Sequence, residues 1–343
     1  MREKDAVSRE FFEDPVRFAD LLNGYVYGGQ QMITAEDVRE LKPTVLRIHS
    51  KKGVIEAQAV TADVVKEVSQ DVRVTVVSLE NQTDVHYAMP VRVMNAESAY
   101  YHSQWRNIAK KHEQERDLGG AEFLSGFAKE DKLVPMITIV VYWGKDVWDG
   151  PRCMKEMLKT KEYPLELQSL IADYPIHLLE IRKYEQLDKF HTDIQYVFGF
   201  LQREMDKEEL KTYVHQHREV FSQLTTDAYD VISVISHSKM LIDRKNEFEA
   251  EGGEYNMCRA IEEMIEEGKI EGKIEGKIEG KIEGHSQMLL LLLEKFGQVS
   301  EELKDRIRQE TDLNILEEWF SNAVNAISTG KVKTFLQNME NTI

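Results

Sequence analysis

The first hydrophobic pattern in the chain predicts an amphipathic helix. Asp14 suits an N-cap, and Pro15 suits the first helical position, where its missing N–H leaves no hydrogen bond unmade. Apolar residues then recur at helical spacing: Val16, Ala19, Leu22 and Val26. We expect this helix to end near the glycine pair at 28–29.

The pattern then becomes extended. Residues 44–50, 54–68 and 73–85 are rich in β-branched and apolar side chains, and turn-like polar or glycine-containing segments separate them. These runs predict neighbouring strands of one sheet.

A helix and a buried strand follow. After Met89 and Pro90 apolar residues return to helical spacing, which predicts a long helix, whereas residues 133–144 are almost all apolar, as in a strand buried on both faces. A helix followed by such a strand implies a crossover connection and a sheet covered by helices. Residues 174–181 are a candidate last strand. The predicted class is therefore α/β.

The rest of the chain is mainly helical in pattern. The four expected regions are a core at 1–160, a helical extension at 161–267 with one candidate added strand, a GKIE repeat at 268–284, and a C-terminal helical segment at 285–343. In a helix the isoleucine of each tetrapeptide is offset by about 40° from the last, which gives a short apolar stripe. Pairing of this stripe would make a homo-oligomer, and a flexible linker is the alternative.

Composition indicates a folded protein that does not cross a membrane. The 343 residues are 42% hydrophobic and 31% charged, and no stretch approaches the about 18 apolar residues of a membrane span. The two cysteines, Cys153 and Cys258, have no metal-ligand spacing, which fits a reducing compartment. We expect a cytoplasmic location.

Charge leaves the question of a nucleic-acid partner open. The formal net charge of −17 argues against a broad surface for phosphate. Acidic residues are concentrated at 244–268, however, while the first third of the chain is richer in basic residues. A local basic face and ordinary solvated surface charges are both compatible with this distribution.

The end of the third extended run carries the candidate chemistry. Alternation along a strand places Glu80 and Gln82 on one face, where the apolar pattern stops. Asp63 lies in the preceding extended run, so two carboxylates could meet at adjacent strand ends and bind Mg²⁺ or Mn²⁺. The alternative is that Glu80 and Gln82 lie in a loop and hydrogen-bond to solvent or backbone.

Several fragments in order resemble a known family. They are FADLLN, ADVVKEV, SLENQTDVHYAMPVRVMNAESAYYHSQ, VPMITIVVYWGKDVWDGP and MCRAIEEM. Together, over most of residues 10–300, the chain is similar to the recombination-promoting nuclease or transposase family of the PD-(D/E)XK superfamily. The resemblance implies a restriction-endonuclease-like core, a mixed sheet flanked by helices, followed by the helical C-terminal region.

The resemblance also implies roles for individual residues. Asp63 matches the aspartate of the motif, Glu80 and Gln82 match its E-x-K/Q pair, and Asp20 on the first helix is a candidate further acid. Two positions depart from the pattern, because Gln82 stands where lysine is usual and Ala62 where arginine is frequent. Glutamine cannot supply the positive charge of lysine, although it can hydrogen-bond water or phosphate.

These assignments predict a magnesium-dependent DNA endonuclease linked to recombination or mobile DNA. Asp63 and Glu80 would hold the ion, which activates a water for attack on the phosphodiester. The candidate DNA contacts are Arg92, Tyr101 and Gln104, with a core role for Tyr101 and a surface ion pair for Arg92 as alternatives.

Two other function classes remain open. One is a nuclease-fold protein with weak or no catalysis that acts through protein contacts. The other is a phosphate-binding enzyme outside nucleic acids, although the sequence has no P-loop. His102 and His112 show no partner at metal-ligand spacing, so no chemistry is predicted for them.

Overall fold

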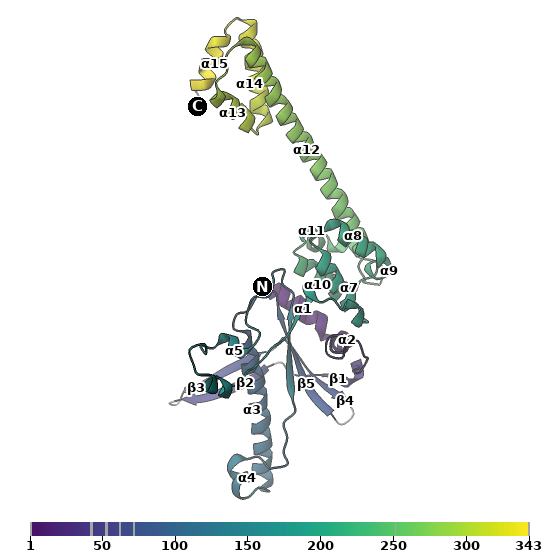
Figure 1. Cartoon of the computed structure of the whole chain (residues 1–343). Helices are drawn as coiled ribbons and strands as arrows, with labels where there is room; N and C mark the ends of the chain where they lie inside the picture. Colours follow the sequence, from purple (N-terminus) through teal and green to yellow (C-terminus); the bar gives the residue numbers. More distant parts are fainter. Residues whose placement is uncertain are drawn as a thin grey trace. The chain divides into compact units, whose positions relative to one another are not determined.

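A five-stranded mixed sheet lies at the centre of the larger of two units (Figure 1). The computed structural model describes residues 2–341 except 42–43, 52–53, 62, 71–72 and 251, and it divides into Met1–Ile261 and Glu262–Ile343. The sheet has the order β1 (Val38–Glu40), β4 (Val64–Gln70), β5 (Arg73–Gln82), β6 (Met136–Tyr142) and β7 (His177–Glu180). Strands β1, β4 and β5 pair antiparallel, whereas β5, β6 and β7 pair parallel. The α/β class predicted from the sequence is confirmed.

Helices cover both faces of this sheet. The helices of the larger unit before α12 are α1 (Arg2–Glu13), α2 (Pro15–Tyr25), α3 (Met89–Glu115), α4 (Gly120–Ser125), α5 (Met154–Met157), α6 (Leu165–Leu170), α7 (Ile194–Arg203), α8 (Lys207–Gln216), α9 (Arg218–Phe221), α10 (Thr226–Ser236) and α11 (Lys239–Asp243). On one face, Met89 and Val93 of α3 pack with Val140 and Tyr142. On the other, Phe11 of α1 lies against the next residue, Trp143. Strand β6 is thus buried on both faces, as its apolar sequence predicts.

The helix predicted after Asp14 forms, but its buried face differs from the prediction. Asp14 caps α2, since its carboxylate accepts the N–H of Val16 at 2.7 Å. Val16 itself and Val26 are half exposed, and Phe18 and Leu21 are buried instead. Helix α1, which the apolar pattern of the sequence does not predict, contributes the buried Phe11.

The prediction of one strand at 54–68 in the same sheet as 44–50 is wrong. Strands β2 (Thr44–Lys51) and β3 (Val54–Thr61) pair only with each other, as a separate two-stranded sheet. The chain bends at Asp63, and β4 begins at the next residue. The carboxylate of Asp63 accepts the N–H of Asn81 at 2.7 Å, so a side chain takes the place of a backbone carbonyl at this end of the ladder.

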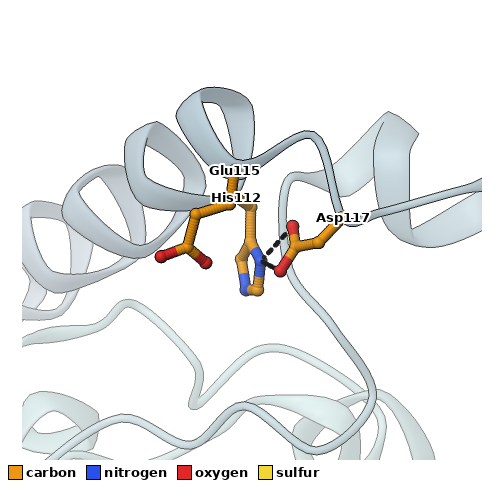
Figure 2. Close-up of side chains that lie close together, drawn as sticks. All are labelled: His112, Glu115 and Asp117. Atoms are coloured by element: carbon orange, nitrogen blue, oxygen red, sulfur yellow. Dashed lines mark hydrogen bonds and ion pairs between the residues drawn. The ribbon is translucent and has the colours of Figure 1, made fainter.

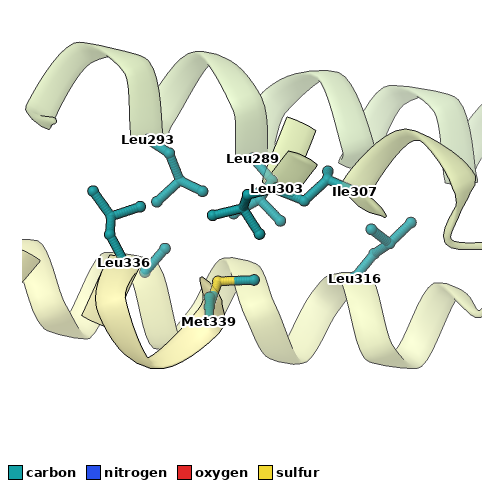
Figure 3. Close-up of a cluster of buried hydrophobic side chains, with 8 residues drawn as sticks. Leu289, Leu293, Leu303, Ile307, Leu316, Leu336 and Met339 are labelled. Atoms are coloured by element: carbon teal, nitrogen blue, oxygen red, sulfur yellow. The ribbon is translucent and has the colours of Figure 1, made fainter. Parts of the chain in front are cut away.

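The smaller unit is helical. It contains most of α12 (Met257–Phe296), followed by α13 (Glu301–Gln309), α14 (Leu313–Ser328) and α15 (Val332–Asn341). Its core, drawn in Figure 3, is a cluster of buried apolar side chains: Leu289, Leu293, Leu303, Ile307, Leu316, Ala323, Leu336 and Met339. These residues recur at helical spacing on each helix, which is why the C-terminal pattern predicts helices. Among the described helices, none has the length and apolarity needed to cross a membrane.

The GKIE repeat is part of the continuous helix α12. Ile270, Ile274 and Ile278 are each about half exposed. A Cβ added to the glycines at 272, 276, 280 or 284 would meet no atom of the described structure within 4 Å. The repeat is therefore a helix rather than an irregular linker in this structure, and self-association through it stays a prediction.

This bare helix leads to a prediction for Gly276. Replacing it by alanine should stabilise the local helix by about 1 kcal/mol, because alanine loses less conformational freedom there and nothing stands in its way. Amide hydrogen exchange across residues 268–284 of the full chain should slow by about fivefold. Gly330→Ala is the control in the same unit, because Gly330 has φ +70° and should destabilise instead. Unchanged exchange in Gly276→Ala would show that the glycines do not limit the helix.

Candidate functional site

The ends of two antiparallel strands bring Asp63 and Glu80 together. Val64 of β4 pairs with Leu79 of β5, so the register continued by one residue sets Asp63 opposite Glu80. Residues opposite one another in an antiparallel pair share a face of the sheet. The structure thus places the two predicted carboxylates side by side, on the face covered by α3.

Glu80 is a buried acid that pairs with Arg92 and lies near a second acid, Asp63. Its side chain is 1% exposed, and Oε2 lies 2.8 Å from Nη2 of Arg92 on α3. Oε1 has no hydrogen-bond partner in the part of the chain that the structure describes. Burial raises the pKa of Glu80 from 4.5 to about 7; Arg92 opposes this rise and Asp63 adds to it. A further cation bound beside this carboxyl would favour its ionised form.

Asp63 is less buried but is perturbed in the same direction. Burial raises the pKa of its carboxyl, while the N–H of Asn81 and the charge of Arg92 oppose that rise. Asp5 and Arg9 of α1 also act on this carboxyl, the first raising and the second lowering its pKa. Sequence reasoning missed both residues of α1. Their spacing of four residues on a helix, which places them on one face, is the signal that could have identified them.

Gln82 ends β5 on the same face as Glu80. It is partly exposed, and its carbonyl accepts the N–H of Trp143 at 2.8 Å. No described residue hydrogen-bonds to its side-chain amide. The amide is therefore available to a ligand beside Glu80.

Packing on the opposite face holds this strand end in place. The indole Nε1 of Trp143 donates to Oδ1 of Asn81 at 2.9 Å. The ring of Trp143 is buried between Phe11 and Phe198, so this side chain is part of the core. Asn81 is thus fixed through both its backbone and its side chain, and the orientation of Glu80 follows.

Tyr101 and Gln104 lie away from the two acids. The hydroxyl of Tyr101 accepts the N–H of Met136 at 3.0 Å and lies 3.2 Å from its carbonyl. The Gln104 amide exchanges two hydrogen bonds with the backbone of Val134, at 2.8 and 2.9 Å. Met136 is four residues before Val140, the partner of Glu80 in β6, which is about 13 Å along a strand. In this structure both side chains fasten α3 to the start of β6.

Asp20 is also engaged elsewhere. Its buried carboxylate accepts the N–H groups of His191 and Thr192 and the hydroxyl of Thr192, at 2.6 to 2.9 Å. These bonds tie α2 to the turn that precedes α7. The structure therefore brings together Asp63, Glu80, Gln82 and Arg92 of the predicted residues, and it gives Asp20, Tyr101 and Gln104 backbone partners of their own.

The donor set at the strand ends fits a hard divalent cation. Mg²⁺ and Mn²⁺ are bound through one or two carboxylates, with waters and substrate oxygens as further ligands. A buried carboxylate oxygen without a hydrogen bond, such as Oε1 of Glu80, is costly in the absence of a cation. No family model, curated protein or solved structure matches the chain. The chemistry is therefore inferred from the geometry of these residues.

Proposed function

We propose that the protein is a divalent-metal-dependent DNA endonuclease, linked to recombination or mobile DNA, which hydrolyses phosphodiester bonds at the Asp63–Glu80 site. The observation that carries this proposal is the buried Glu80 carboxyl opposite Asp63, with its pKa raised to about 7 and an oxygen that lacks a hydrogen bond. A perturbed acid beside a second acid is typical of functional sites. The mixed sheet with helices on both faces is compatible with the restriction-endonuclease-like core that the sequence resemblance implies.

The residues would divide the work as follows. Asp63 and Glu80 would hold the ion, Mg²⁺ or Mn²⁺, and such an ion would supply an activated water and offset charge on the phosphate. Gln82 hydrogen-bonds the water or a phosphate oxygen. Arg92 is 39% exposed, and the ion would replace it as the counter-charge of Glu80. The guanidinium of Arg92 would then be free to make a bidentate contact with a phosphate of the DNA backbone.

One observation favours a second candidate, a nuclease-fold protein without catalysis. Arg92 already neutralises Glu80, which is almost fully buried, and such a pair is also found as a structural feature. The net charge of −17 is unfavourable for binding DNA broadly. In this case the protein would act through contacts with other proteins.

Plasmid cleavage separates the two candidates. We expect nicking or cutting with Mg²⁺ or Mn²⁺, none with EDTA, and none for Asp63→Ala. Asp188→Ala is the matched control, because Asp188 is 71% exposed and pairs only with its neighbour Lys189 among the described residues. A well-folded wild type that cuts no DNA under any of these ions would refute the nuclease and leave the second candidate.

Gln82→Lys tests the role of the third residue. Lysine adds the positive charge that the resembling sequences usually carry, so cleavage should persist or rise, by up to about 100-fold. Gln82→Met, which has a similar length but no donor, should lose activity. The measurement is the initial rate of plasmid cleavage by the wild type and both variants at one Mg²⁺ concentration. A folded but inactive Gln82→Lys would show that the amide makes a bond that lysine cannot replace.

A further inference from the structure

A second cluster of ligand-type side chains surrounds His112 at the end of α3 (Figure 2). The ring Nδ1 lies 2.8 and 2.9 Å from the two carboxylate oxygens of Asp117, and Nε2 lies 2.9 Å from Oδ2 of Asp131. The expectation that His112 has no partner is therefore wrong. Helix α3 ends at Glu115, and the left-handed Arg116 turns the chain so that Asp117 returns to the histidine.

The spacing of the donors suits one metal ion. One ligand atom each from His112, Glu115 and Asp117 lie within 4.8 Å of one another. Two donors that each lie about 2.0–2.1 Å from a tetrahedral ion are themselves about 3.4 Å apart. The 2.8 Å between His112 and Asp117 is already close to that value. Glu115, whose side chain is half exposed, offers a carboxylate oxygen within 4.8 Å of the other two ligand atoms.

Asp131 supplies an independent indication. Its Oδ2 faces Nε2 of His112 and also accepts the N–H of Ala128 at 2.7 Å, so it is fixed in place. A carboxylate on one ring nitrogen holds the proton there and leaves the lone pair of the other for a metal. Here the other nitrogen is Nδ1, which hydrogen-bonds to Asp117 in this structure, so a metal ion would take the place of the proton between them (Figure 2). A carboxylate that holds the far ring nitrogen of a histidine, as Asp131 does here, is the usual support of a metal-bound histidine.

The charges also favour a dication. Three carboxylates, of Glu115, Asp117 and Asp131, surround one imidazole, so even a protonated ring leaves the group at −2. A neighbouring cation is Lys111, whose Nζ is 3.9 Å from Glu115 and which also acts on Asp131. Hydrogen bonds to Asp117 and then Asp131 raise the pKa of His112, so a proton partly balances the carboxylates without metal. A divalent ion would balance them better.

We propose that His112, Glu115 and Asp117 bind a divalent transition-metal ion of the Zn²⁺ type, with Asp131 as a positioning residue. Nitrogen and carboxylate ligands in a three-residue set leave a fourth position for water. The ion would fasten the end of α3 to the segment that contains α4. His112 is twenty residues from Arg92 on the same helix, about 30 Å by helical rise, so this site is separate from the Asp63–Glu80 site.

Zn²⁺ titration of the full chain tests the proposal. Calorimetry in a Glu80→Gln background removes the other acid pair, so the result does not depend on the proposed nuclease activity. We expect one Zn²⁺ per chain. His112→Asn should abolish this binding, and Asp131→Asn should weaken it by about 10- to 100-fold with the stoichiometry unchanged. Amide exchange across 117–131 should slow when Zn²⁺ is added.

Two further variants serve as controls for the Zn²⁺ titration. His102→Asn, an exposed histidine on the same helix, should bind as the parent does. Glu115→Gln removes one ligand without touching the contacts of His112 to Asp117 and Asp131, so it should weaken binding even if His112→Asn fails to fold. Zn²⁺ binding weaker than about 1 mM, or equal binding by parent and Glu115→Gln, would overturn the proposal.

Discussion

Replacing Glu80 by glutamine should stabilise the metal-free protein at pH 8 by up to about 3 kcal/mol, and should leave its stability at pH 4 nearly unchanged. The pKa of Glu80 is raised from 4.5 to about 7 in the folded chain, chiefly by burial. Between these values the folded state keeps a proton that the unfolded state has lost. Stability therefore falls as pH rises from about 4.5 to about 7. Glutamine does not titrate, so this loss disappears.

Urea unfolding in EDTA at several pH values measures the effect. The wild type should lose stability relative to Glu80→Gln across this range, with a constant difference above about pH 8. Glu36→Gln is the control, since this glutamate is exposed and should not alter the pH dependence. Parallel curves for wild type and Glu80→Gln would mean that Glu80 is ionised at little cost.

The same variant should lose DNA cleavage by at least about 1000-fold, because one of two metal ligands is gone. A gain in stability together with a loss of activity is the mark of an acid kept for function at the expense of the fold. If Glu80 has only a structural role, Glu80→Gln would still change stability, but neither the variant nor the wild type would cleave DNA. The two readouts together therefore separate the nuclease from its non-catalytic alternative.

Replacing Arg17 by alanine should destabilise the larger unit by about 3–5 kcal/mol. Arg17 on α2 is 4% exposed, and its Nε and Nη2 each lie 2.8 Å from the carboxylate of Asp193, at the start of α7. Its Nη1 bonds Asp227 of α10 at 3.1 Å. Alanine would leave the mostly buried carboxylate of Asp193 without its cation, and an unpaired buried charge costs more than the ion pair itself contributes.

Chemical unfolding at pH 7 tests this prediction. Arg308→Ala, which removes an exposed ion pair with Asp305 in the other unit, should change stability by less than about 1 kcal/mol. Adding Asp193→Ala to Arg17→Ala should cost less than the sum of the two single changes, because the second change removes the orphaned charge. Strict additivity would show that Arg17 and Asp193 are not coupled.

Sequence periodicity predicted the elements whose buried residues form a long, regular pattern within one segment of the chain. The strand at β6 and the helix α3 were readable because their apolar patterns are long and uniform. The separate sheet of β2 and β3 was not, because an extended pattern does not reveal its partner. Helix α1 was missed because its buried aromatic residues, Phe11 and Phe12, are adjacent and show no period.

The same limit applies to the candidate sites. Alternation along β5 set Glu80 and Gln82 on one face, and the register then placed Asp63 opposite. The His112 cluster needed a chain reversal at Arg116, which no spacing rule predicted. The partners of Tyr101 are backbone atoms of a distant strand, so its sequence neighbours could not identify them.

The contacts of Arg17 can form only late in the synthesis of the chain. Its partners Asp193 and Asp227 follow it by 176 and 210 residues. At about 5 to 20 residues per second, a ribosome needs about 10 to 40 s to produce the second of them. During that time the guanidinium of Arg17 has neither Asp193 nor Asp227 as a partner. Helix α2 therefore gains these two ion pairs only late in synthesis, when α7 and α10 have been made.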